Sequence, residues 1–212
     1  MTEIQKTATL DFYYDFGSPN AYFAWKALQG VIERTGLKVI MHPVLIGGIF
    51  KSTGNQPPWQ AFGNVPNKMK YMQLEIQRFI KDHKLSAFKF NSAFPVNTLL
   101  SMRAAIVAQK AGVHETFYPA VFKALWEDDK NISQPEVLTE VLNEAGLDGN
   151  ALIAATQTPD IKQALMEATQ ACVDRGAFGL PTFFLGDDIY FGKDRMWPVS
   201  YTHLTLPTTP YV

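Results

Sequence analysis

The chain has 212 residues, of which 47% are hydrophobic and 18% charged, and its formal net charge is -1. This length suffices to bury a sizeable core, and a near-zero charge without a basic stripe argues against nucleic acid as the main partner. The single cysteine excludes an internal disulfide and suits a reducing compartment. Residues 1–8 do not read as a signal peptide, and no apolar run approaches the ~20 residues of a membrane span, so we expect a cytoplasmic protein without a membrane partner.

The first strong pattern lies in residues 9–25, where a strand is followed by a tight turn and a helix. Apolar residues alternate over 9–15, which predicts the strand, and Gly17 suits the turn. Ser18 is a favoured N-cap and Pro19 a favoured first helical residue. The Ser18 hydroxyl is therefore expected at the positive end of a helix dipole, where an anion or a thiolate is stabilised, although Ser-Pro is also a common structural cap.

A helix, a second strand and a loop are expected next. The pattern predicts a helix over 19–35, ended by Gly36, and a strand over 37–41 that runs parallel to the first after a right-handed crossover. Gly47-Gly48 and residues 52–66 interrupt the periodicity, and the stretch is rich in Gly, Pro and Asn. A long loop is therefore predicted there.

Helical periodicity then dominates up to residue 176. An amphipathic helix is predicted over 68–81, with its methionines in the core. The other predicted helices begin at recognisable caps or prolines: at Asn97 or Thr98, near Phe117, at a Ser133–Glu136 capping box, at Asp148 and at Thr158-Pro159. Cys172 falls on the buried face of the last helix, where an inert thiol is expected. The four histidines are isolated, so no metal site is predicted.

A β-hairpin is predicted over 180–191, and it follows a proline at the head of an apolar strand, Phe178-Gly-Leu-Pro-Thr-Phe-Phe184. Pro181 is tolerated there if its peptide bond is cis or the strand is an edge beside a site. Paired with the Ser18 turn, this is the signature of the thioredoxin superfamily, in which a Cys-x-x-Cys turn or its replacement meets a cis-proline loop. Ser18 and Ala21 stand in for both cysteines, which disfavours disulfide exchange.

Six runs, in order, resemble the 2-hydroxychromene-2-carboxylate isomerases, relatives of the kappa-class glutathione transferases: Tyr14-Asp-Phe-Gly-Ser-Pro-Asn-Ala-Tyr22, Gly54-Asn-Gln-Pro-Pro58, Val65-Pro-Asn-Lys68, Phe94-Pro-Val-Asn-Thr98, Gly179-Leu-Pro-Thr-Phe183 and Phe191-Gly-Lys-Asp-Arg195. The resemblance covers residues 9–196. This resemblance and the order of the predicted elements indicate an α/β protein with a thioredoxin-like fold and a large all-α insertion domain. We expect residues 1–46 and 158–196 to form a discontinuous thioredoxin-like domain, 47–157 the helical insertion, and 197–212 an atypical tail, interpreted as an out-of-frame or truncated end.

The resemblance implies glutathione as the cofactor, with Ser18 as the catalytic residue that donates a hydrogen bond to the glutathione sulfur. It further implies glutathione-binding roles for the backbone of Leu180, for a cis Pro181, for Asp194 at the γ-glutamyl ammonium, and for Asn55 and Lys68 at the peptide carboxylate and amide groups. Lys193 stands where kappa transferases usually carry a small hydroxyl residue, so no γ-glutamyl contact is assigned to it.

The implied reaction is isomerisation of 2-hydroxychromene-2-carboxylate to trans-o-hydroxybenzylidenepyruvate, by glutathione thiolate addition, bond rotation and elimination. Tyr22, Phe50 and Trp59 are expected to provide an apolar wall for this small aromatic substrate. Two alternatives stay open: a kappa-class transferase or peroxidase acting on another electrophile, and a non-catalytic thioredoxin-like binding module. The relatives also imply a homodimer.

Overall fold

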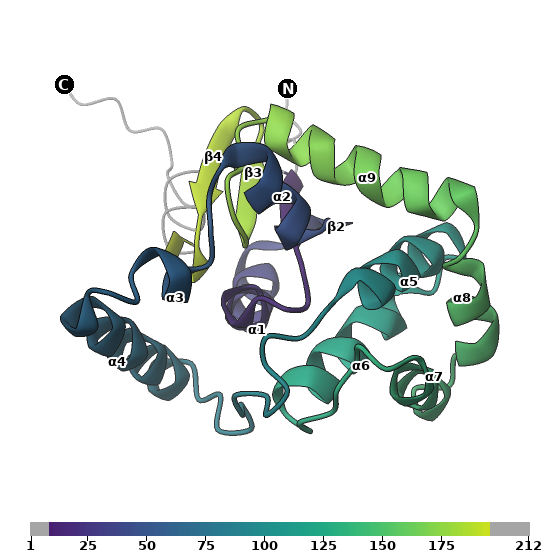
Figure 1. Ribbon diagram of the computed structural model, residues 1–212, viewed down its shortest axis with the longest axis horizontal. Helices are drawn as coiled ribbons and strands as arrows, with labels where there is room; N and C mark the ends of the chain where they lie inside the picture. The colour runs from purple at the N-terminus through teal and green to yellow at the C-terminus, as the bar shows by residue number, and fades with distance from the viewer. Residues whose placement is uncertain (1–8, 196–212) are drawn as a thin grey trace, which may run out of the picture.

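The computed structural model describes residues 9–195, and Figure 1 shows a small sheet with helices arranged around it. Four strands form this sheet in the order β2-β1-β3-β4. β1 (Thr9–Tyr14) runs parallel to β2 (Lys38–Pro43) and antiparallel to β3 (Thr182–Leu185), which forms a hairpin with β4 (Asp188–Phe191). The tail predicted over 197–212 lies outside the described residues.

The parallel pair is joined by α1 (Pro19–Thr35), as the sequence predicts. The helix ends at Gly36, which adopts a φ of 66° and donates its N–H to the Ile32 carbonyl at 2.8 Å. Glycine is the natural residue there because a side chain is strained in the left-handed region. The β1-α1-β2 unit and the antiparallel hairpin form a thioredoxin-like fold, so the predicted fold class is confirmed.

A run of helices, which includes the helical insertion, lies between β2 and β3 in the chain. It comprises α2 (Ile46–Thr53), α3 (Pro58–Ala61), α4 (Pro66–Asp82), α5 (Leu99–Lys110), α6 (His114–Trp126), α7 (Pro135–Glu144), α8 (Gly149–Ala155) and α9 (Pro159–Asp174), and a 3-10 turn (Lys193–Arg195) follows β4. The helices from α5 to α8 pack on one another beside the sheet (Figure 1). Among residues 9–195, no helix is long and apolar enough to cross a bilayer. The domain bounds given above stay a prediction.

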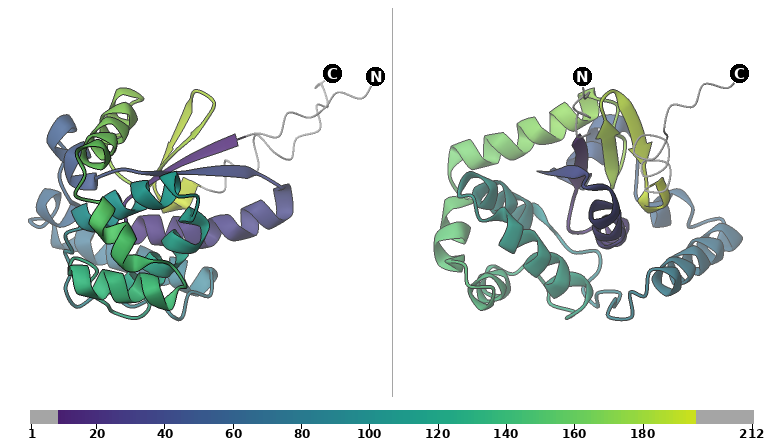
Figure 2. Two further views of the ribbon diagram at one scale, coloured as in Figure 1. Left: turned by 90° about the vertical axis from the view of Figure 1, so that its right-hand side faces the viewer. Right: turned by 180° about the vertical axis from the view of Figure 1, so that it is seen from behind.

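Alternation along β1 separates two packing faces of the sheet. Leu10, Phe12 and Tyr14 belong to the main core, which also contains apolar residues of α1, α5 and α6. Tyr13 points the other way and joins a smaller cluster with residues of α2 and α9, including the buried Cys172. The two views of Figure 2 show α1 and α9 on opposite sides of the strands. The sheet is therefore covered on both faces.

Three local predictions are wrong. Gly47-Gly48 lie in the first turn of α2 rather than in a loop, and residues 58–61 form the short helix α3. Ser133 does not cap α7: the N-cap is Gln134, which makes no side-chain capping bond, and the Ser133 hydroxyl donates to Asn131 Oδ1 at 2.6 Å. The methionines in the first half of α4 are half-buried and lie outside both core clusters.

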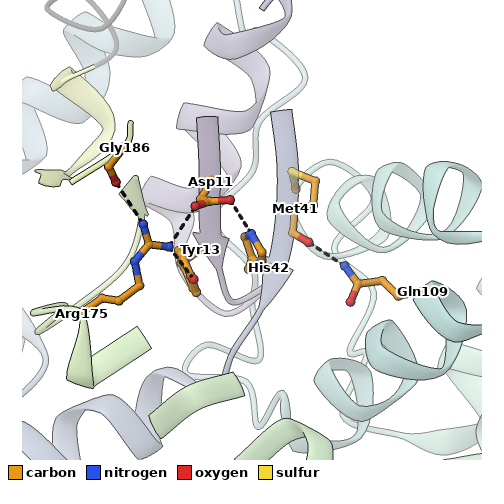
Figure 3. A network of polar contacts seen from close by, with 7 residues as sticks. All are labelled: Asp11, Tyr13, Met41, His42, Gln109, Arg175 and Gly186. Atoms are coloured by element: carbon orange, nitrogen blue, oxygen red, sulfur yellow. Dashed lines mark hydrogen bonds and ion pairs between the residues drawn. The ribbon is translucent and has the colours of Figure 1, made fainter. Parts of the chain in front are cut away.

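A polar network at the edge of the smaller cluster ties the strands to α9 (Figure 3). The Asp11 carboxylate contacts His42 Nε2 and Arg175 Nη1, each at 2.9 Å. Arg175 Nη1 also donates to the Tyr13 hydroxyl at 3.0 Å, and its Nη2 donates to the Gly186 carbonyl at 3.3 Å. One guanidinium thus connects β1, the loop after α9 and the β3–β4 turn.

Candidate active site

The turn after β1 has the predicted geometry. Ser18 is the N-cap of α1, with extended backbone angles, and its Oγ accepts a hydrogen bond from the Ala21 N–H at 3.2 Å. Pro19 occupies the first helical position. The Ser18 side chain therefore lies at the positive end of a 17-residue helix, as expected from the sequence.

The loop that contains Pro181 contacts the Ser18 turn, so the two sequence signals lie side by side. The Leu180-Pro181 peptide bond is cis, and the Ser18 hydroxyl donates to the Leu180 carbonyl at 3.3 Å across 162 residues of chain. Ser18 is 5% exposed and Leu180 is buried beside it. Within residues 9–195 the Leu180 N–H has no hydrogen-bond partner. A free backbone donor next to a buried hydroxyl suits an extended peptide ligand that pairs with the chain at Leu180.

The environment of Ser18 favours a hydrogen-bond donor over a nucleophile. A serine nucleophile needs a base within hydrogen-bond reach, and no described histidine or carboxylate makes a hydrogen bond to Ser18 Oγ. The hydroxyl has one proton, which it gives to the Leu180 carbonyl. Rotation about its C–O bond would redirect that proton to an anion placed at the helix end.

Asp15 is a site residue that sequence reasoning missed. Its carboxylate is fully buried, accepts the Gly17 N–H at 2.9 Å and the Ile46 N–H at 2.8 Å, and is also hydrogen-bonded to Thr98. Burial raises the pKa of Asp15 above its ordinary value, against the lowering effect of these hydrogen bonds. Both oxygens hold backbone donors, so Asp15 fixes the turn. An aspartate two residues before a turn glycine was the available signal.

Asn55 contacts the cis-proline loop, and its glutathione-binding role stays a prediction. Its Nδ2 donates to the Phe178 carbonyl at 2.7 Å, two residues before Leu180, and its Oδ1 accepts the Gln56 N–H. Phe178 and Phe191, whose ring centroids are 4.5 Å apart, are both exposed next to this loop. The surface beside the loop therefore exposes one side-chain amide and two aromatic rings.

The structure does not bring Lys68 and Asp194 into contact with Ser18 or Leu180. Lys68 Nζ lies 3.2 Å from the centroid of the Phe62 ring, on the exposed start of α4. Asp194 forms an ion pair with Lys193 at 2.5 Å, and Lys193 is buried with its Nζ 4.7 Å from the Phe79 centroid. The ligand-binding roles of both residues stay predictions.

The predicted apolar wall is only partly available. Tyr22 is 1% exposed and its hydroxyl donates to Glu127, so its ring cannot face a substrate and that prediction is wrong. Phe50 is half-buried. Trp59 is 42% exposed and packs edge-on against Phe94, with ring centroids 5.0 Å apart. Trp59 therefore remains suited to a wall.

Neither cysteine nor metal chemistry is suggested by the described residues. Cys172 is buried, and burial raises the pKa of its thiol to about 12, which fits the predicted inert role. No group of three or more metal-ligating side chains occurs in the described part of the chain.

Known proteins resemble the chain over most of its length. A family model for the DSBA-like thioredoxin domain matches residues 9–201. The 2-hydroxychromene-2-carboxylate isomerase of Sphingobium xenophagum is 28% identical over 192 residues, which are 90% of this chain and 95% of the relative. Glutathione S-transferase kappa 1 of Rattus norvegicus is 28% identical over 205 residues, 91% of this chain and 89% of the relative. A solved 2-hydroxychromene-2-carboxylate isomerase structure aligns with a TM-score of 0.76 at 22% identity, over 92% of this chain and 93% of that one. These findings confirm the predicted resemblance, and the chain belongs to the DSBA-like thioredoxin domain family.

Proposed function

We propose that the protein is a glutathione-dependent enzyme whose thiolate site lies between Ser18 and Leu180. The observation that carries this proposal is the hydrogen bond from the Ser18 hydroxyl to the Leu180 carbonyl, at the N-terminus of α1 and beside cis Pro181. The relatives named above support the glutathione part of the proposal, since kappa glutathione S-transferases are among them.

The residues present fit the chemistry of glutathione. Its extended peptide needs backbone partners, and Leu180 offers an N–H that is unpaired within residues 9–195. Asn55, between α2 and α3, is held against the cis-proline loop by its hydrogen bond to the Phe178 carbonyl. At the other end of the ligand, Asp194 would have to exchange its ion pair with Lys193 for the γ-glutamyl ammonium. Lys68 would have to leave the Phe62 ring to reach a carboxylate.

The chain's own contribution is electrostatic. When bound, glutathione supplies a thiolate that adds to an electrophilic carbon and later leaves. The Ser18 hydroxyl would donate its hydrogen bond to the sulfur instead of to the Leu180 carbonyl and keep its proton, and the α1 dipole adds a favourable potential at the same point. Both effects favour the thiolate over the thiol, whose pKa is ~8.5 when free. Asp15 keeps the turn in place by holding the Gly17 and Ile46 N–H groups.

We assign the reaction as isomerisation of 2-hydroxychromene-2-carboxylate to trans-o-hydroxybenzylidenepyruvate. An isomerase of that name is 28% identical to the chain over 90% of its length, which supports the assignment. The exposed Trp59, beside Phe94, would contact the aromatic substrate. The proposal includes a cytoplasmic location and a homodimer, and sedimentation at micromolar concentration tests the dimer.

A kappa-type transferase or peroxidase is the second candidate, because its kappa relatives are as similar to the chain as the isomerase. It would use the same Ser18 site on a different electrophile. A non-catalytic binding module is the third reading, and only this one predicts that the wild type shows no glutathione-dependent turnover and that Ser18→Ala changes nothing.

The test is the ultraviolet-monitored conversion of 2-hydroxychromene-2-carboxylate with and without glutathione. We expect glutathione-dependent turnover that Ser18→Ala reduces at least tenfold and that Ser86→Ala, an exposed serine in the turn after α4, leaves unchanged. Glutathione binding without turnover would replace the isomerase with the transferase. Full turnover in Ser18→Ala would contradict the proposed thiolate site.

A further inference from the structure

A second site candidate lies in the helical insertion, in a cavity of about 310 Å³. The cavity is formed where the start of α5 faces the segments before α7 and after α8, and it is lined by Asn97, Leu99, Leu100, Arg103, Ser133 and Gln157. Its volume falls at the lower end of the range for small-molecule pockets, ~300–1,000 Å³. The chemistry of its walls decides what it would hold.

Arg103 is the residue that makes this cavity unusual. It lies one turn inside α5, it is half-buried, and its Nε is buried without any hydrogen-bond partner. Its guanidinium makes no hydrogen bond or ion pair with any other residue of 9–195. A buried donor left unpaired is costly, so native proteins normally supply an acceptor. None of the residues that line the cavity is acidic.

Asn97 lines the same cavity at its exposed side and adds a second donor there. Its Oδ1 accepts the Leu99 N–H at 3.0 Å, which fixes the side chain at the start of α5. No described residue accepts a hydrogen bond from its Nδ2. Leu99, the first residue of α5, also lines the cavity, so the positive end of the α5 dipole lies at its wall. A guanidinium, a primary amide and a helix N-terminus together form a receptor for a negative oxygen pair.

The apolar residues that line the cavity indicate which kind of group the ligand carries beside its negative charge. Leu99 and Leu100 are half-buried and pack against the main core while also facing the cavity. They offer an apolar surface beside the charged one. A fully hydrated inorganic anion would gain nothing from the leucines, whereas a carboxylate attached to a small apolar or aromatic group would use both.

We propose that this cavity binds the carboxylate of a small apolar or aromatic acid, with Arg103 and Asn97 as the residues that hold the two oxygens. The inference goes beyond the proposed function, because it requires neither glutathione nor Ser18. Ser133 and Gln157 have other partners, Asn131 Oδ1 and Thr156 Oγ1, and serve as the far wall. The site selects for the negative charge of the ligand.

The test uses benzoate as the probe and benzyl alcohol as its neutral counterpart, with binding to the full chain followed by heteronuclear NMR. We expect benzoate, but not benzyl alcohol, to shift the amide signals of Leu99 and Leu100 in a saturable manner. Arg103→Gln should weaken benzoate binding at least tenfold. Lys110→Gln is the matched control, because it removes the same charge from the exposed end of the same helix.

A second variant keeps the proposal testable if Arg103→Gln does not fold. Asn97→Asp retains the oxygen that accepts the Leu99 N–H but replaces the amide donor with a negative charge. It should therefore fold normally, as circular dichroism would verify, and should weaken benzoate binding at least tenfold. Equal binding of benzoate to the wild type, Arg103→Gln and Asn97→Asp would overturn the proposal. Absence of saturable benzoate binding to the wild type would overturn it as well.

These outcomes are separate from those of the proposed function. Glutathione binding by Arg103→Gln and Asn97→Asp should equal that of the wild type. Loss of benzoate binding with intact glutathione binding supports the cavity, whereas failure of glutathione binding in the wild type would count against the Ser18 site alone.

Discussion

At the scale of single residues, Ser18 and Asp15 have different roles in the turn between β1 and α1. Ser18 caps α1 and contacts the cis-proline loop, while Asp15 holds the backbone that positions Ser18. The Ile46 N–H, which also binds Asp15, is the first amide of α2. The carboxylate therefore links the turn to a helix 31 residues further along the chain.

Replacement of Asp15 tests this structural role. Asp15→Ala leaves the Gly17 and Ile46 N–H groups without their acceptor in a buried place, and each unpaired donor costs about 1–3 kcal/mol. We expect the free energy of unfolding in urea to fall by at least ~2 kcal/mol. Asp187→Ala, at an exposed position of the β3–β4 turn, should change it by less than ~0.5 kcal/mol. Equal effects of the two substitutions would show that Asp15 does not hold the turn.

At the scale of elements, α2 shows what the sequence leaves open. Its first amide is satisfied by Asp15 and its N-cap residue Leu45 makes no side-chain capping bond, so no local start signal precedes it. The helix instead packs on α9, where Thr169 Oγ1 accepts the Leu45 N–H at 3.0 Å. Gly47-Gly48 suggested a loop because glycine is a poor helix former. The contacts that stabilise the helix come from distant parts of the chain, so the local sequence does not predict it.

The two glycines of α2 provide a matched pair of substitutions. A Cβ on Gly48 would lie 2.9 Å from Thr169 Cγ2, and Thr169 is held by hydrogen bonds at its hydroxyl, whereas a Cβ on Gly47 meets nothing within 4 Å. Gly48→Ala should therefore lower the free energy of unfolding by about 1–3 kcal/mol. Gly47→Ala should raise it by about 0.5–1 kcal/mol, because alanine favours a helix. Thermal and urea unfolding of the two variants measure both signs, and stabilisation by Gly48→Ala would mean that α2 does not pack closely on α9.

The elements that the sequence predicts correctly have local signals, whereas the missed ones depend on contacts with distant residues. The strand–turn–helix at Ser18 and the hairpin after Pro181 were predictable because alternation, capping and proline signals are all local. The capping box at Ser133 failed because Asn131, not a helical N–H, is the partner of the serine. For Lys68, the sequence predicts a charged side chain at the start of a helix, but it does not predict that this side chain contacts the Phe62 ring.

At the scale of the whole molecule, the Asp11–Arg175–His42 network connects β1 and β2 to the loop after α9 (Figure 3). Burial alone would raise the pKa of Asp11, but hydrogen bonds and charge from Arg175 and His42 outweigh it and lower the pKa below its ordinary value of 3.8. A lowered pKa means that the folded chain holds this proton less tightly than the unfolded chain does. The stabilisation is therefore fully present above about pH 4 and is lost as the pH falls through the lower, folded value.

Asp11→Asn tests this pH dependence. At pH 7 the variant should be less stable than the wild type, and the difference between their free energies of unfolding should shrink steadily when the pH is lowered from 5 to 2. Urea unfolding across this range measures the difference, with Asp187→Asn as the exposed control. A difference that stays constant from pH 5 to pH 2 would contradict the role of the Asp11 charge.

The most direct test of the thiolate site is the pKa of the thiol of bound glutathione, followed by the ultraviolet absorbance of the thiolate with protein in excess. In the wild type and in Ser86→Ala this pKa should lie below the ~8.5 of a free thiol. Ser18→Ala should raise it by about one to two pH units, because a hydrogen bond to a charged group contributes about 1.5–3 kcal/mol. The same bound-thiol pKa in the wild type and Ser18→Ala would contradict the proposal that Ser18 and the α1 N-terminus stabilise the thiolate.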